Sequence, residues 1–159
     1  MVSTLEVRSH VIRESKIIHK SPVLHPLARF VTEETVAMMF NITLAQIDRV
    51  ECWKNMVYIH AQGVSRFVSY ADFPAILDVQ APENQDFVRW RKRWRKRWHS
   101  HLAPEFWQRF YTEHFRNAES LAQLYHWGKL VNVIKSLLSE TVIEQLRSIF
   151  IEQKTYWEF

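Results

Sequence analysis

The sequence predicts an α+β fold, in which N-terminal strands, a helix-turn-helix-like pair and a β-hairpin precede a helical C-terminal part. Residues 56–61 and 64–70 are two runs rich in β-branched and aromatic side chains. Gly63 lies between them and supplies the positive φ of a tight turn, so these runs predict the hairpin. Apolar residues at helical spacing dominate the second half of the chain and predict helices there.

Within the first half, residues 3–20 alternate apolar and charged side chains, which predicts one or two strands. A first helix is expected to begin after Thr32, with acidic residues in its first turn, and to end at Asn41. Residues 43–46 have the capping-box pattern of a threonine followed three positions later by glutamine. We therefore expect a second helix that runs to about Val50.

The polar segment around Pro82 predicts a boundary between an α+β part, residues 1–80, and a helical part, residues 81–159. Gly128 is expected to stop or bend a helix, because glycine is a poor helix former. The periodic segments of the helical part are 84–100, 104–115, 119–127, 129–138 and 141–153.

Composition argues against most enzyme classes. Only two glycines are present, Gly63 and Gly128, so a glycine-rich phosphate loop or nucleotide-binding fingerprint cannot form. The single cysteine, Cys52, excludes an internal disulfide and a cysteine-based zinc site, and it favours a reducing, cytoplasmic location. His99 and His101 form the one close histidine pair, without the carboxylate spacing of a metal motif. We expect a non-enzymatic protein with no cofactor, no metal, no signal peptide and no membrane span.

The positive charge of the chain is concentrated in one segment. Seven of the nine residues from 89 to 97 are basic, and removing them from the net charge of +4 leaves −3 for the rest. They are Arg89, Arg91, Lys92, Arg93, Arg95, Lys96 and Arg97. Such a cluster predicts an anionic partner, which could be DNA, RNA, anionic lipid or an acidic protein surface.

Aromatic residues run through the same segment. Phe87, Trp90, Trp94 and Trp98 are spaced by three, four and four positions, which places them along one side of a helix. Two interpretations are open. The rings can pack on the following helices and leave the cations in solvent, or they can be exposed and stack on bases or lie in a membrane interface.

Residues 31–77 carry a further pattern of acidic helix start, turn and hairpin. Its positions are Thr32, Glu33, Glu34, Val36, Ala37, Asn41, Ile42 and Thr43, with Gly63, Arg66, Phe67, Ser69 and Asp72 in and after the hairpin. This pattern resembles the winged helix-turn-helix of excisionase-type and MerR-type DNA-binding proteins. The resemblance implies that Gln46 and Arg49 face the major groove and that Arg66 meets phosphate. The same elements also suit a helix pair and hairpin with no role in DNA binding.

These observations predict a nucleic-acid-binding protein whose basic helix supplies affinity, with DNA favoured over RNA. A regulatory or mobile-element role is implied by the resemblance alone. The alternative is a protein–protein adaptor or assembly factor that docks an acidic partner through the same aromatic and basic helix. Homo-oligomerisation is open under either hypothesis.

Overall fold

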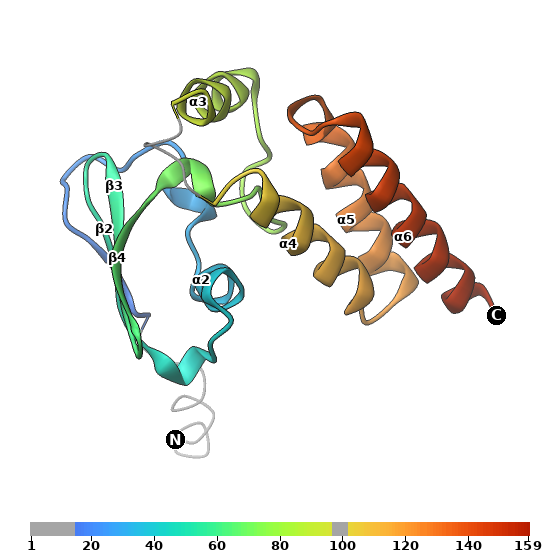
Figure 1. Cartoon of the computed structure of the whole chain (residues 1–159), viewed down its shortest axis with the longest axis horizontal. Helices are drawn as coiled ribbons and strands as arrows, with labels where there is room; N and C mark the ends of the chain where they lie inside the picture. Colours follow the sequence, from blue (N-terminus) through green and yellow to red (C-terminus); the bar gives the residue numbers. More distant parts are fainter. Residues whose placement is uncertain (1–14, 97–101) are drawn as a thin grey trace, which may run out of the picture.

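A computed structural model describes residues 15–96 and 102–159 and confirms the α+β fold (Figure 1). A four-stranded sheet lies in the first half of the chain and helices make up the second. The strand expected before residue 15, Arg97, Trp98 and the histidine pair at 99 and 101 lie outside the described residues. None of the described helices is both long enough and apolar enough to cross a bilayer.

The sheet consists of β1 (Ile17–His19), β2 (Ile47–Cys52), β3 (Met56–Ala61) and β4 (Val64–Ser69), in that order. The first pair of strands is parallel, and the others are antiparallel. The predicted hairpin is confirmed as β3 and β4, and Gly63 between them has a φ of 78°.

The predicted first helix is confirmed as α2 (Glu33–Phe40), which lies over one face of the sheet (Figure 1). The Thr32 hydroxyl caps it by accepting a hydrogen bond from the Thr35 N–H at 3.1 Å. Asn41 ends it in the left-handed conformation, with φ 56° and ψ 48°. Val36 and Met39 form its buried side.

The predicted second helix is wrong, although its capping interaction forms. The Gln46 side chain accepts from the Thr43 N–H at 2.9 Å. This contact closes only the single 3₁₀ turn η2 (Leu44–Gln46), and β2 begins at the next residue. The reading helix of the winged helix-turn-helix pattern is therefore a strand in this protein.

A β-bulge explains why this strand resembles a helix in sequence. The register of β2 against β3 shifts between Ile47 and Arg49. A bulge inserts an extra residue, so side chains three positions apart can point to the same face. Ile47 and Val50 are both buried, at 2% and 0% exposure. The three-residue apolar spacing in this segment comes from the bulge.

The basic helix is α3 (Asn84–Trp94), which is shorter than expected because residues 95 and 96 already form a turn. Two tertiary contacts account for the earlier end. The Trp94 Nε1 donates to the Ala71 carbonyl at 2.8 Å, and the N–H groups of Leu102 and Ala103 bind the Asp72 carboxylate. The chain is thereby held close to the 3₁₀ turn η3 (Tyr70–Asp72) on both sides of residues 97–101.

Three further helices complete the fold, α4 (Glu105–Arg116), α5 (Leu121–Ile134) and α6 (Glu140–Glu158), and they pack side by side (Figure 1). The predicted interruption at Gly128 is wrong, because α5 continues through it. A β-carbon at this position would lie 2.6 Å from the Phe150 Cε1, so the glycine lets that ring pack directly on the α5 backbone. Glycine is therefore required at position 128 because the Phe150 ring packs there, and not because a helix ends there.

The buried side chains of both halves form one hydrophobic cluster. Trp90 and Trp107 meet edge to face with ring centroids 5.1 Å apart, and both are fully buried. Arg109 of α4 donates to the Met38 carbonyl of α2 at 2.7 Å. The helical part therefore packs on the sheet-bearing part, while the composition boundary near residue 80 stays a prediction.

Candidate functional site

Four cations of α3 and the turn after it share one side of the helix. Arg89, Lys92, Arg93 and Lys96 are separated by three, one and three positions, which at about 3.6 residues per turn places them within an arc of about 100°. We call this set the basic face. The remaining described cations of the segment, Arg91 and Arg95, are exposed on a different side.

The aromatic side of α3 faces the core. Trp90 is fully buried, and Trp94 is half-buried and packs edge to face on Trp107 at 4.7 Å. Phe87 is half-buried beside Trp90. This confirms the core interpretation for Trp90, whose ring is not available to bases or lipid, and it places Trp94 at the margin of the same core. Trp98 lies outside the described residues.

The basic face lines a cleft of about 580 Å³. The other side of the cleft consists of His25 and Leu27 from the loop before η1 (Ala28–Phe30), Asn55 from the turn between β2 and β3, and Met56 at the start of β3. Figure 1 places α3 beside that end of the sheet. Arg93 spans the cleft, since its Nη1 donates to the Asn55 carbonyl at 3.2 Å.

Most of the positive charge in the cleft is left without a carboxylate. Arg89 is 3.3 Å from Asp86, a carboxylate that it shares with Arg29. Within residues 15–96 and 102–159, no carboxylate lies within 4.0 Å of Lys92, Arg93 or Lys96. A concave site with uncompensated cations raises the local concentration of anions.

His25 contributes a neutral donor to this site. Burial, and then the positive charges of Arg93 and Arg89, lower the pKa of His25 to about 4. Its ring stacks on Tyr70 with centroids 4.1 Å apart, and its Nδ1 accepts from the Leu27 N–H at 3.0 Å. The neutral ring therefore carries its proton on Nε2, where it can donate a hydrogen bond.

The residues implied by the winged helix-turn-helix pattern do not join the basic face. Gln46 lies in η2, at the opposite end of the sheet from α3 (Figure 1). Arg49 of β2 is already neutralised, because it contacts Glu51 at 2.7 Å and Asp48 at 2.9 Å. Arg66 of β4 is exposed, with its guanidinium 5.9 Å from the centre of the Phe40 ring. No reading surface forms from these three.

Comparison with known proteins assigns no family. A search of protein-family models finds no match, and neither the search of curated proteins nor that of solved structures finds one. The excisionase and MerR resemblance stays a prediction, and its second helix is a strand in the structure.

Two participants in the cleft carry no usable signal in the sequence. His25 stands between two prolines in a loop, and Asn55 lies in the short turn between β2 and β3. Helical periodicity finds cations on one helix, but it cannot show which loops of a sheet will face them. Only the tertiary fold brings His25 and Asn55 to α3.

Proposed function

We propose that this protein binds nucleic acid by contacting its phosphate backbone with the basic face of α3. The observation that carries the proposal is that Lys92, Arg93 and Lys96 line a cleft and have no carboxylate within 4.0 Å among the described residues. Phosphate contacts made by lysine and arginine supply most of the affinity of sequence-independent binding.

The dimensions of the basic face suit a phosphate chain. Residues 89 to 94 rise about 7.5 Å along α3 at about 1.5 Å per residue, and Lys96 lies two residues beyond the end of the helix. A face of this length can contact more than one phosphate of a nucleic-acid strand. Arg93 offers a planar fork for two oxygens, whereas the lysines act as point charges.

The proposal includes no reading of base sequence. Base readout in the major groove needs an element that enters the groove. The segment from residue 43 to about 50, which was expected to form that element, is the turn η2 followed by β2; β2 pairs with β3 along its length and with β1 at residues 50–52. We therefore propose binding that is insensitive to sequence, and the regulatory or mobile-element role implied by the resemblance gains no support from the fold.

Matched charge variants test this proposal. The double variant Lys92→Gln and Lys96→Gln removes two charges from the cleft, and Arg91→Gln with Arg95→Gln removes two from the other side of the helix. We expect the first pair to weaken binding of a labelled oligonucleotide about tenfold or more, because each charge-assisted hydrogen bond contributes roughly 1.5 kcal/mol or more. Fluorescence anisotropy at one fixed salt concentration measures both affinities.

The control pair is expected to change the affinity about threefold at most, since its cations do not line the cleft. Both double variants have the same net charge, so equal losses would mean that only total charge matters. That result, or no measurable binding by the unmodified protein, would refute the proposal.

An adaptor that docks an acidic protein is the second candidate, and the exposed end of α6 favours it. Tyr156 is 72% exposed and Trp157 is 38% exposed, and such rings are enriched at protein interfaces. The aromatic stripe of α3 can no longer serve this role, because Trp90 is buried. Purified protein with raised absorbance at 260 nm supports the nucleic-acid proposal, and co-elution with a specific protein supports the adaptor.

A further inference from the structure

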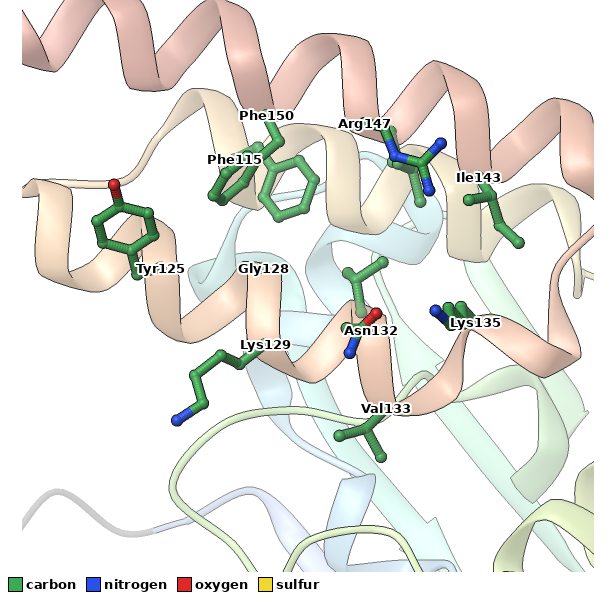
Figure 2. A pocket seen from close by; sticks show the side chains of 12 residues that line it. Phe115, Tyr125, Gly128, Lys129, Asn132, Val133, Lys135, Ile143, Arg147 and Phe150 are labelled. Atoms are coloured by element: carbon green, nitrogen blue, oxygen red, sulfur yellow. The ribbon is translucent and has the colours of Figure 1, made fainter.

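A second recess lies between α5 and α6, away from α3. Its volume is about 460 Å³, within the range of pockets that bind small molecules. Phe115 of α4 is buried at its base and meets the ring of Phe150 of α6 with centroids 5.5 Å apart (Figure 2). We call this recess the helical groove. No residue lines both the helical groove and the basic cleft, so it is a separate site.

The helical groove is polarised from end to end. Figure 2 shows the rings of Phe115, Phe150 and Tyr125 toward one end and the side chains of Arg147 and Lys135 toward the other. Gly128 allows the Phe150 ring to rest on α5 at the aromatic end. The surface thus changes from apolar to cationic along its length.

Its charge is all of one sign. The charged residues that line it are Lys129, Lys135 and Arg147, with no acidic side chain among them. In the described part of the chain, none of the three has a carboxylate within 4.0 Å. The Lys129 side chain extends away from the groove, so Lys135 and Arg147 are the cations placed to meet an occupant (Figure 2).

We propose that the helical groove binds a single-chain anionic amphiphile, with its acyl chain on Phe115 and Phe150 and its acidic head group between Lys135 and Arg147. Burial of the acyl chain removes apolar surface of the ligand and of the groove from water. The head group gains charge-assisted hydrogen bonds from two cations that have no carboxylate within 4.0 Å in the part of the chain that the structure describes. A free fatty acid and a lysophospholipid share this chemistry.

The shape of the groove favours such a ligand over the helix of a partner protein. A docked helix lies along a surface and places apolar residues at intervals of about one turn. Here the aromatic rings gather toward one end, and Arg147 and Lys135, the two cations placed to meet an occupant, lie toward the other end beside Ile143. That arrangement matches a molecule with one apolar tail and one charged end.

Titration of the purified protein with sodium dodecanoate tests the proposal, with amide chemical shifts as the readout. We expect saturable shifts concentrated in α5 and α6. Lys135→Gln combined with Arg147→Gln should weaken dodecanoate binding about tenfold or more, because it removes both head-group contacts. Lys129→Gln is the matched control from the same lining, and it should change the affinity less than twofold. Lysophosphatidate, run in parallel, shows which acidic head group the site prefers.

A second variant separates loss of the site from loss of the fold. Asn132 is an exposed residue of α5 that lines the groove, so Asn132→Trp fills the space from the surface and should abolish dodecanoate shifts while the rest of the spectrum is kept. Equal binding of decyltrimethylammonium, equal weakening by Lys129→Gln, or binding of an acidic amphipathic peptide in place of dodecanoate would each overturn the proposal. The basic cleft is untouched by these variants, so either proposal can fail alone.

Discussion

Replacing Asp72 with alanine is expected to lower the free energy of unfolding by about 3 kcal/mol or more. The carboxylate is fully buried and accepts from three backbone N–H groups, those of Ser69 at 3.0 Å, Leu102 at 3.1 Å and Ala103 at 3.2 Å. Each buried donor left without an acceptor costs roughly 1–3 kcal/mol. Alanine removes the acceptor for all three at once.

The position of Asp72 makes this effect larger than that of an ordinary core substitution. Its carboxylate joins the N–H of Ser69, at the end of β4, to the N–H groups of Leu102 and Ala103 in the segment that leads into α4. Urea denaturation followed by tryptophan fluorescence measures the loss. The control is Asp48→Ala, whose side chain is 71% exposed and whose surface ion pair contributes about 1 kcal/mol at most. If the two variants were equally stable, the role assigned to Asp72 would be wrong.

Removing Asp86 is expected to cost about 3–5 kcal/mol, the usual range when one partner of a buried ion pair is deleted. The Asp86 side chain is 4% exposed and lies 2.5 Å from the Arg29 Nη2. It also accepts from the Glu83 N–H at 2.9 Å, which caps the start of α3. Asp86→Ala would leave the Arg29 guanidinium half-buried and without its anion.

A double-variant cycle isolates the ion pair from the cap. Arg29→Met and Asp86→Leu should each destabilise strongly, whereas the combined variant should recover part of the loss, because apolar pairs can replace buried ion pairs at little cost. Strict additivity of the two single effects would contradict a direct interaction. Urea is the suitable denaturant, since it does not screen charge as a salt does.

Asp86 should also make the free energy of unfolding depend on pH. Burial alone would raise the pKa of Asp86, but the hydrogen bonds from Arg29 and the Glu83 N–H, with the charges of Arg29 and Arg89, hold it below its ordinary value of 3.8. A carboxyl group with a lowered folded-state pKa stabilises the fold above its unfolded-state pKa. That contribution is lost as the pH falls from about 4 through the folded-state pKa, and Asp86→Asn should show a weaker acid dependence in this window.

Elements defined by local chemistry could be predicted from the sequence. The helix start after Thr32, the helix end at Asn41 and the turn at Gly63 need only neighbouring residues, and all three are confirmed. The second helix was wrong because the bulge in β2 imitates helical spacing. The break at Gly128 was wrong because its cause is the Phe150 ring on another helix. Both depend on partners distant in the chain, which a local pattern cannot reveal.

The candidate site, too, could be predicted only where neighbouring residues of one helix define it. Spacing alone separated the cations of α3 from its aromatic rings, because both sets lie on one helix. It could not show that Arg91 and Arg95 stay outside the cleft, nor that His25 and Asn55 lie within it. Those assignments follow from how α3 packs against the sheet through Trp90 and Trp94.

The pKa of His25 tests most directly whether an anion occupies the basic cleft. Its pKa of about 4 is held down in part by the charges of Arg93 and Arg89, so a phosphate placed between those cations should raise it toward the ordinary value of 6.5. We would follow the His25 ring by NMR against pH, with and without a short oligonucleotide. A rise in the His25 pKa of about one unit or more is the predicted result. Full binding of the oligonucleotide with no change at His25 would show that the polyanion lies elsewhere.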